Sequence, residues 1–362
     1  MNKRIVAQNR TVLVGVDVHT KSHVVTIKVG SEIMGTCTLS PNRDAWRSFL
    51  KRVPGCELHV VYESGPNGYN LHDWLMELRQ EYEGGAIYVY IAPPALVPKA
   101  PGKKRVKTDK RDSAALIQAL EMKSFRPVVV PDRALREARE LVRTREQMMR
   151  TRTSLKNKIH GMAKFHGIEY PDQGARWTLK WIEQLAVNVK EADTTGSLNY
   201  AFKMKIKMLK EMTEVIERLD KRIKRLSEKG SCGATARKLT KLPGIGTLSA
   251  AIIATEVADF AAFDKSSSFA SYVGLVPGES SSGESTHRGH ITRAGNRRLR
   301  WIFTECAWSW LRNDPEARRI YNRIRAGKTE RTRIAIVAMA RRLAVKAYHQ
   351  VMNEHPEHNI AA

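Results

Sequence analysis

The first 125 residues alternate between apolar β-branched runs and segments whose apolar residues recur at helical spacing. The runs "TVLVGVDVHT", "HVVTIKVG" and "EIMGTCTLS" predict three strands in series, separated by turn-prone residues. "NRDAWRSFLKRV" and "NLHDWLMELRQEY" predict helices, the first with Asn42 as its N-cap. Two further strands are predicted at "CELHVVYES" and "AIYVYIAP", and a last helix at "TDKRDSAALIQAL". This alternation predicts an α/β domain over residues 1–128.

The order of these elements is that of a ribonuclease-H-like fold: three strands, then helix, strand, helix, strand, helix. Two acids lie at the ends of predicted strands, Asp17 on the first and Glu63 on the fourth. Ligands of open α/β sheets gather at the carboxyl ends of the strands. Asp109 and Asp112 are three residues apart, so on a helix they project from one face. The sequence therefore predicts four carboxylates in one site.

Four neighbouring carboxylates repel one another unless divalent cations lie between them. Mg²⁺ prefers oxygen ligands and suits a phosphodiester substrate, so we predict that the four acids bind Mg²⁺. Simpler roles stay open for each acid. Asp17 alone could belong to a turn or cap, Asp109 could cap its helix, and Asp109 and Asp112 could balance the neighbouring cations. His19 and His23 are interpreted as polar turn residues.

Residues 129–230 consist almost entirely of helix formers and carry long charged runs. Two apolar stripes predict a coiled coil or an antiparallel helix pair, interrupted at "GIEYPDQGARW". The stripes comprise Leu141, Met148, Leu155, Ile159 and Met162, and then Ile206, Leu209, Ile216 and Leu219. Two roles stay open for this segment: a solvated spacer, or a dimerisation element that also contacts nucleic-acid backbone.

Residues 231–362 predict a mainly helical C-terminal domain. In "LTKLPGIGTLSAAIIATEV", Gly244 and Gly246 allow a tight turn before an apolar helix, as in a helix-hairpin-helix element. The free backbone N–H groups at the start of that helix could bind a DNA phosphate. A purely structural turn is the alternative. Trp301, Trp308 and Trp310 are predicted to belong to the core.

The stretch "GESSSGESTHRG" places three serines before a glycine, a composition typical of a polar loop. Five arginines follow within thirteen residues, and such a cluster could bind a phosphate and stabilise charge that develops on it. A second basic cluster lies in the loop before the last predicted helix of the first domain. The candidate nucleic-acid contacts are Arg288, Arg293, Arg297, Arg298, Arg300, Lys103, Lys104, Arg105 and Lys107, with Gly244 and Gly246.

The charge of the chain narrows the class of partner. With 62 Lys and Arg against 37 Asp and Glu, the net charge is +25, which attracts polyanions. The basic residues are spread along the whole chain rather than beside one apolar face, and no apolar run is long enough to span a membrane. The N-terminal "MNKRIVAQNR" has no apolar signal core, and the four cysteines form no CxxC pair. We therefore expect a cytoplasmic nucleic-acid-binding protein with reduced thiols and no membrane partner.

Taken together, these motifs resemble those of the DEDD-type insertion-sequence transposases. The resemblance covers nearly the whole chain, and the ordered set is specific although no single motif is decisive. It rests on "GVDVHTKSHVV", "VVYESGPNGY", "KTDKRDSAAL", "LPGIG", "YVGLVPGESSSGE" and "GHITRAGNRRLRW". Members of this family have a RuvC-like N-terminal domain, a coiled-coil middle and a C-terminal transposase domain with a catalytic serine.

The resemblance implies a recombinase guided by a non-coding bridge RNA that pairs with donor and target DNA. Asp17, Glu63, Asp109 and Asp112 would bind Mg²⁺ and position the scissile phosphate. The serine before the glycine of the motif, Ser282, would attack that phosphate and form a covalent phosphoserine link. Ser281 is the next choice and Ser280 is the least favoured. Glu284 after Gly283 departs from the common family pattern.

Further expectations concern the assembly and the alternative functions. The site would be shared between protomers, and the helical middle suggests a homodimer or homotetramer. A metal-dependent junction endonuclease that uses water in place of serine is the first alternative function. A non-catalytic protein that binds RNA or DNA and has kept the fold is the second.

Overall fold

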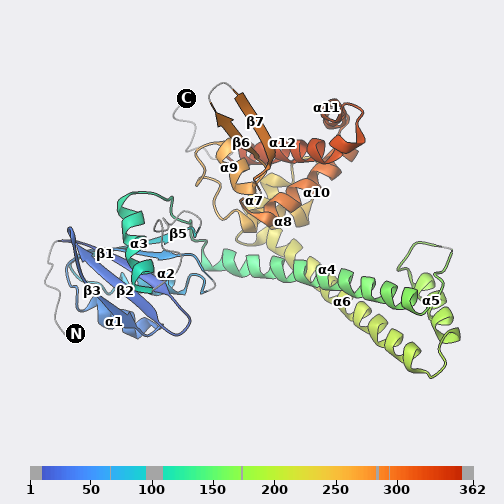
Figure 1. Ribbon diagram of the computed structural model, residues 1–362, viewed down its shortest axis with the longest axis horizontal. Helices are drawn as coiled ribbons and strands as arrows, with labels where there is room; N and C mark the ends of the chain where they lie inside the picture. The colour runs from blue at the N-terminus through green and yellow to red at the C-terminus, as the bar shows by residue number, and fades with distance from the viewer. Residues whose placement is uncertain are drawn as a thin grey trace. The chain divides into compact units, whose positions relative to one another are not determined.

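The structure is a computed structural model that describes residues 10–65, 67–94, 109–172, 174–282, 285–292 and 294–352 (Figure 1). By its internal contacts the chain divides into two compact units, Met1–Val130 and Pro131–Ala362. The first boundary lies close to the predicted one at residue 128. The separate middle and C-terminal domains remain a prediction, and they are described together here as the second unit.

The first unit is built on a five-stranded mixed sheet. Its strands are β1 Thr11–Val18, β2 His23–Val29, β3 Glu32–Leu39, β4 Glu57–Glu63 and β5 Ala86–Ala92. Their order across the sheet is β3-β2-β1-β4-β5. β1 is antiparallel to β2 and parallel to β4, which is parallel to β5. The predicted element order is therefore confirmed, and the mixed sheet is consistent with a ribonuclease-H-like fold.

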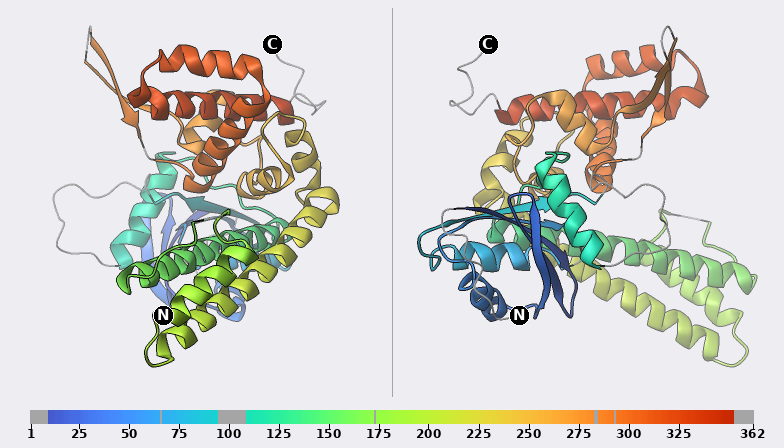
Figure 2. Two further views of the ribbon diagram at one scale, coloured as in Figure 1. Left: turned by 90° about the vertical axis from the view of Figure 1, so that its right-hand side faces the viewer. Right: turned by 60° about the vertical axis from the view of Figure 1, so that its left-hand side comes forward.

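Helices cover both faces of this sheet (Figures 1 and 2). On one face, α1 Arg43–Leu50 and α2 Asn70–Leu78 bury their apolar stripes against alternate residues of β1 and β4. The predicted N-cap is confirmed, since Asn42 Oδ1 accepts a hydrogen bond of 2.9 Å from the backbone N–H of Ala45. On the other face lies α3, Asp109–Glu121, which packs on β1, β2 and β4.

Gly15 lets α3 lie directly on β1. A Cβ atom at this position would lie 1.9 Å from the backbone oxygen of Ser113, so no other residue fits without moving the helix. Ser113 Oγ hydrogen-bonds Thr26 Oγ1, opposite Gly15, at 2.7 Å. Near the other end of α3, Glu121 accepts a hydrogen bond of 2.6 Å from Lys28, which pairs nearer the start of β1. α3 therefore runs opposite to β1, and its N-terminus lies toward the carboxyl end of that strand.

The second unit is helical apart from one β-hairpin. Two long helices, α4 Arg133–Phe165 and α6 Ser197–Lys229, pack along each other, with α5 Leu179–Glu191 between them in the chain (Figures 1 and 2). The remaining elements are α7 Gly233–Leu239, α8 Thr247–Glu256, α9 Ser266–Val273, β6 Pro277–Ser282, β7 Ser285–Ile291, α10 Arg297–Asn313, α11 Pro315–Arg325, a 3₁₀ turn at Thr329–Arg331 and α12 Thr332–Met352.

The long helices belong to two cores. Leu135, Val142 and Ile223 pack in the same core as the C-terminal helices, whereas Ile159 and Ile206 pack around α5 in a core of their own. The predicted helix pair is thus confirmed. The buried stripe includes the predicted Leu155, Ile159, Ile206, Leu209 and Ile216, while Leu141, Met148, Met162 and Leu219 are only half-buried. Supercoiling of the pair remains a prediction.

Three local predictions are wrong. The serines of "GESSSG" were expected in a loop, but Ser280, Ser281 and Ser282 end strand β6, which pairs with β7. Trp301 was expected in the core with Trp308 and Trp310, but its side chain is 44% exposed on α10, because only the opposite side of that helix packs inward. His23 was interpreted as a turn residue, but it begins β2 and is buried under α1.

The cysteines carry free thiols and are largely buried. All four cysteines are free, and Cys56, Cys232 and Cys306 are buried. Burial raises the pKa of the Cys306 thiol to about 11, so this sulfur stays protonated and unreactive at neutral pH. Within the described residues, no helix combines the length and the hydropathy that crossing a membrane requires.

Candidate active site

Two of the predicted acids lie at the carboxyl ends of adjacent parallel strands. Val16 of β1 pairs with Tyr62 of β4, so Asp17 and Glu63 come next on their strands. Asp17 follows Gly15, which α3 covers, and Glu63 follows Val61, which packs among α3 side chains. Because strand residues alternate between faces, both carboxylates project on the α3 side of the sheet.

The start of α3 brings a third carboxylate to the same edge. Asp112 lies one helical turn before Leu116, which packs in the same small core as Val61. Since α3 runs opposite to β1, Asp112 lies on the part of the helix nearest the carboxyl ends of the strands. Asp109 is the first residue of α3, and its side chain falls outside the described part of the structure. We name this region the acid edge, comprising Asp17, Glu63 and Asp112.

The donors of the acid edge are of the right chemical kind for magnesium. All three groups are carboxylates, the oxygen ligands that Mg²⁺ prefers. Among the described residues, however, no three His, Cys, Asp or Glu side chains are arranged closely enough to form a metal site. This statement does not cover Asp109, whose side chain lies outside the described residues. The structure thus places three acids on one edge, and their binding of a common metal ion remains a prediction.

His19 contacts the first of these acids. Its Nε2 lies 3.1 Å from Oδ2 of Asp17, and the Asp17 side chain keeps 20% of its surface exposed. The contact fixes one carboxylate oxygen while the group remains accessible. Sequence reasoning treated His19 as a turn residue. The spacing of two residues across the end of a strand was the available signal, and it is too common to be specific.

The candidate serines lie on the β-hairpin of the second unit. Ser280 pairs with His287, Ser281 with Thr286, and Ser282 with Ser285 at the end of the hairpin. The serine side chains, and Gly283 and Glu284 between the two strands, fall outside the described structure. What the structure adds is regular backbone: the candidate nucleophile ends a paired strand rather than lying in an irregular loop.

The base of this hairpin is held by tight backbone packing. Gly295 has φ +87°, and a Cβ atom there would lie 2.5 Å from the backbone oxygen of Tyr272. The next residue, Asn296, donates its backbone N–H to that same oxygen at 2.8 Å. Closer to the strands, Thr292 N–H donates to the backbone oxygen of Val276 at 3.3 Å. Gly295 and Asn296 therefore hold the start of α10 against α9 through backbone contacts that only glycine permits.

A buried glutamate, Glu256, also binds the segment that follows the hairpin, through the side chain of Asn296. Glu256, 3% exposed, accepts hydrogen bonds from Arg143 at 2.8 and 3.0 Å and from the Asn296 amide at 3.1 Å. Burial by itself would raise the pKa of Glu256, but the Arg143 pair and the Asn296 bond outweigh burial and the pKa is lowered. Arg298 Nε donates to Glu146 at 2.7 Å, a second link from α10 to α4. Sequence reasoning missed Glu256 and Arg143, which are 113 residues apart.

We expect Glu256→Ala to destabilise the second unit by about 2–3 kcal/mol, because it removes the buried carboxylate that accepts charge-assisted hydrogen bonds from Arg143 and a further bond from Asn296. The exposed pair of Arg133 and Glu137 supplies the control, since Glu137→Ala should cost about 0.5 kcal/mol or less. Urea unfolding followed by circular dichroism measures both changes.

The pH dependence of this loss follows from the lowered pKa of Glu256. The stabilisation by the carboxylate is complete above its unfolded pKa and is lost as the pH falls through the folded pKa. Wild type and Glu256→Ala should therefore converge in acid. An equal stability difference at every pH would contradict the ionic role of Glu256.

The arginines predicted to contact nucleic acid differ in whether they are accessible or already bonded within the fold. Arg298 is held by Glu146, Arg300 donates to the backbone oxygen of Ala294 at 3.1 Å, and Arg297 is exposed. The side chain of Arg288 and all of Arg293 lie outside the described structure, as do Lys103, Lys104, Arg105 and Lys107. Arg297 is thus the accessible candidate among the three arginines that the structure describes.

The "LPGIG" turn lies between α7 and α8, as predicted. Gly244 has φ +89°, and a Cβ atom there would lie 2.6 Å from the backbone oxygen of Cys306 on α10. Close packing against α10 thus explains why position 244 requires glycine, independently of any DNA contact. Gly246 is the exposed N-cap of α8 and, as a glycine, has no side chain to which the first N–H groups of that helix could donate. DNA contact at this turn remains a prediction, carried by Gly246 and the α8 N-terminus.

Comparison with known proteins gives a consistent result. A DEDD transposase model of the IS110 type matches residues 14–167, and the model of the "Transposase IS116/IS110/IS902 family" matches residues 236–322. The "Putative transposase y4qE" of Sinorhizobium fredii is 30% identical over 312 residues, 85% of this chain and 74% of that protein. The "Probable family 20 transposase" of Pseudomonas aeruginosa is 27% identical over 84% of this chain and 86% of its own length.

A further relative is named for its mobile element. The "Transposase for insertion sequence element IS1111A" of Coxiella burnetii is 27% identical over 217 residues, 59% of this chain and 57% of that protein. The first family model spans the strands that carry Asp17 and Glu63 and the helix that carries Asp112, and the second spans the serine hairpin. The chain belongs to the IS110 family of insertion-sequence transposases.

Proposed function

We propose that this transposase is a site-specific recombinase that cuts and rejoins donor and target DNA through a covalent link to Ser282. One observation carries the proposal: Asp17, Glu63 and Asp112 lie at one edge of a sheet within the segment that matches the DEDD transposase model. Asp109, at the start of α3, completes the proposed set of four acids. Mg²⁺ bound there would stabilise the negative charge that develops on the phosphate.

The proposed serine step conserves the phosphodiester bond. Oγ of Ser282 bonds to phosphorus, the bond from phosphorus to one sugar oxygen breaks, and that oxygen takes up a proton as the strand end leaves. A second strand end then attacks the phosphoserine, forms the new phosphodiester and returns the serine hydroxyl. The chain needs no ATP for this exchange, because the number of phosphate ester bonds is unchanged throughout.

The arginine-rich segment supports the same step. Arg297 is exposed close to the hairpin base, and a guanidinium there can pair with phosphate oxygens in bidentate geometry. The Glu256–Arg143 pair and the Asn296 contacts would hold the hairpin base in position during attack. Arg298 and Arg300 have partners within the fold, so we assign them to holding this segment rather than to phosphate.

The proposed partners are DNA and a guide RNA transcribed from the element. The net charge of +25 suits a protein that binds more than one nucleic acid at once. We propose a homodimer or homotetramer, in which the active site is shared between protomers. Within such an assembly the acid edge of one protomer could act with the hairpin of another.

Copurifying RNA gives the direct test. We expect the chain, expressed together with the flanking sequence of its own element, to retain a discrete RNA. Recombination of two plasmids that carry donor and target sites should then require Mg²⁺ and stop after ribonuclease treatment. Addition of the transcript should restore it. Recombination by the RNA-free chain at the normal rate would contradict guidance by RNA.

A further inference from the structure

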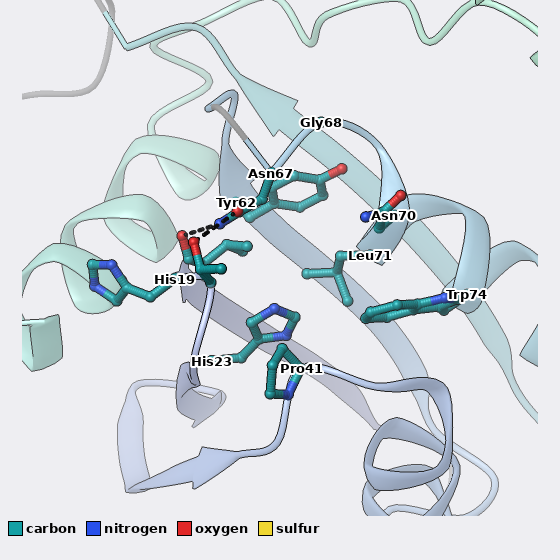
Figure 3. Close-up of a pocket in the computed structure, with 11 residues that line it drawn as sticks. His19, His23, Pro41, Tyr62, Asn67, Gly68, Asn70, Leu71 and Trp74 are labelled. Carbon is teal, nitrogen blue, oxygen red and sulfur yellow. Dashed lines mark hydrogen bonds between the residues drawn. The ribbon is translucent and has the colours of Figure 1, made fainter.

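A pocket of about 140 Å³ opens at the carboxyl ends of β1 and β4, on the side of the sheet that α1 and α2 cover (Figure 3). It is lined by residues of both strand ends, of the two loops that follow them, and of α2. The lining consists of Val18, His19, Thr20, His23, Pro41, Tyr62, Asn67, Gly68, Asn70, Leu71 and Trp74.

The pocket adjoins the acid edge. Val18 directly follows Asp17, and Tyr62 directly precedes Glu63. His19 belongs to both places, since it lines the pocket and contacts Oδ2 of Asp17 at 3.1 Å. The acids and the pocket lie at the same strand ends but on opposite faces of the sheet, so a nucleic-acid strand bound at the acid edge would reach the pocket by placing a neighbouring base across the end of β1.

His23 contributes a defined hydrogen-bond donor. Nδ1 of His23 accepts a hydrogen bond of 3.0 Å from Trp46 Nε1, an N–H group that can only donate. The proton of the neutral ring is therefore on Nε2. Burial and the nearby His19 lower the pKa of His23 to about 4, so the ring is neutral at pH 7. The hydrogen bond from Trp46 occupies Nδ1, so Nε2 is the ring nitrogen that can donate to a ligand, and His23, 3% exposed, lines the pocket.

The other walls suit a flat ring with polar edges. Trp74 and Leu71 of α2 and Pro41 are apolar, and the Trp74 side chain is half-buried at the pocket (Figure 3). The loop on the far side is held by Asn67, whose Nδ2 donates to the backbone oxygen of Val18 at 3.1 Å. Asn70, exposed at the start of α2, adds an amide that can both donate and accept.

The volume of the pocket and the charge of its lining restrict the class of ligand that it can bind. A volume of about 140 Å³ equals that of roughly five liquid waters, enough for a small ring but not for a whole nucleotide. The lining contains no Lys, Arg, Asp or Glu, so it offers no permanently charged side chain to pair with a phosphate. A neutral heteroaromatic ring that stacks on tryptophan and accepts a hydrogen bond from histidine meets all of these conditions, as nucleobases do.

We propose that this pocket binds one nucleobase, turned out of the DNA strand whose backbone lies at the acid edge. The proposal rests on the proposed function only for the identity of the strand. A base held there would fix the register of the strand and hence which phosphate faces the acids. Removing a base from its stack costs free energy, and stacking on Trp74 together with the hydrogen bond from His23 would offset that cost.

An abasic scan tests the proposal with the full-length protein. The probes are single-stranded DNA oligonucleotides from the end of the element, each lacking one base, with affinity measured by fluorescence anisotropy in calcium and again in EDTA. For wild type, we expect removal of one particular base to weaken binding about tenfold, the effect of one stacked base. Trp74→Ala should weaken binding of the intact strand by a similar factor, with no further loss when that base is absent.

The controls separate the pocket from the rest of the unit. Tyr88→Ala removes an aromatic ring, 40% exposed on β5 and outside the pocket, and should leave the sensitivity to the missing base unchanged. Asn70→Ala offers a milder change should Trp74→Ala fold poorly, and it should reduce the same sensitivity. Additive losses for the base and the side chain, or an effect confined to an RNA version of the strand, would overturn the proposal. Because no cleavage is measured, the outcome is independent of the serine mechanism.

Discussion

Asp17→Asn should reduce DNA cleavage and strand transfer on the order of 10³-fold while DNA binding stays within about twofold, since a preorganised charge is lost from the active site. The substitution removes one negative charge from the acid edge and preserves the size of the side chain. Asparagine can still contact His19, so the end of β1 should keep its conformation. The loss would therefore report the carboxylate itself, as the proposed binding of Mg²⁺ requires.

A matched control lies on the neighbouring strand. Glu57 begins β4, at the opposite end from Glu63, where it pairs with His59 on the exposed surface. Glu57→Gln removes the same charge from the same sheet and should leave cleavage unchanged. Activity is measured on a plasmid with donor and target sites, and thermal unfolding confirms that each variant is folded. Wild-type activity in Asp17→Asn would show that the Asp17 carboxylate takes no part in catalysis, and would contradict the proposed set of four acids.

The structural features that position the acid edge differ in how far the sequence predicts them. The ends of β1 and β4 follow from local patterns, because apolar alternation and turn residues set the strands near Asp17 and Glu63. That the strands are adjacent and parallel is a property of the whole sheet, inferred from element order. The direction of α3 depends on Gly15 and on the Thr26–Ser113 contact, which no local pattern indicates.

The parts that sequence reasoning missed are long-range contacts between polar groups. Glu256 and Arg143 form an ion pair only because α4 and α8 pack together, and nothing near either residue shows this. His23 illustrates the same limit, since a histidine beside a turn is normally exposed, whereas here Trp46 of α1 supplies a donor and buries it. The polar composition of "GESSSG" favoured a loop, but pairing with β7 satisfies its backbone in a strand.

Trp301 illustrates the limit of periodicity. Three tryptophans on one helix suggested a common buried stripe, yet Trp310 is 3% exposed while Trp301 lies on the outer side of α10. A helix of 17 residues presents more than one face, and spacing alone does not say which one packs. The exposed ring lies on the same helix as Arg297, beside the serine hairpin. Both side chains are therefore accessible on the surface that the proposed function assigns to DNA.

Ser282→Ala should abolish the covalent link between protein and DNA, and with it strand exchange, by at least about 10³-fold, because alanine has no oxygen that can attack phosphorus. The substitution removes a single oxygen and leaves the backbone pairing of Ser282 with Ser285 in place. Binding of DNA and of the guide RNA should be unaffected. The link is detected as labelled DNA that remains attached to the protein in denaturing gels, with peptide mass spectrometry to identify the modified serine.

The neighbouring serines make the test specific. Ser280→Ala and Ser281→Ala carry the same chemical change on the same strand, so each should retain the link if Ser282 is the nucleophile. Transfer of the defect to Ser281→Ala would reassign the nucleophile within the hairpin and preserve the mechanism. Cleavage that persists in all three variants, still dependent on Asp17 and never accompanied by a protein–DNA link, would instead indicate attack by water. The hairpin would then hold or guide the DNA, and the acid edge alone would account for catalysis.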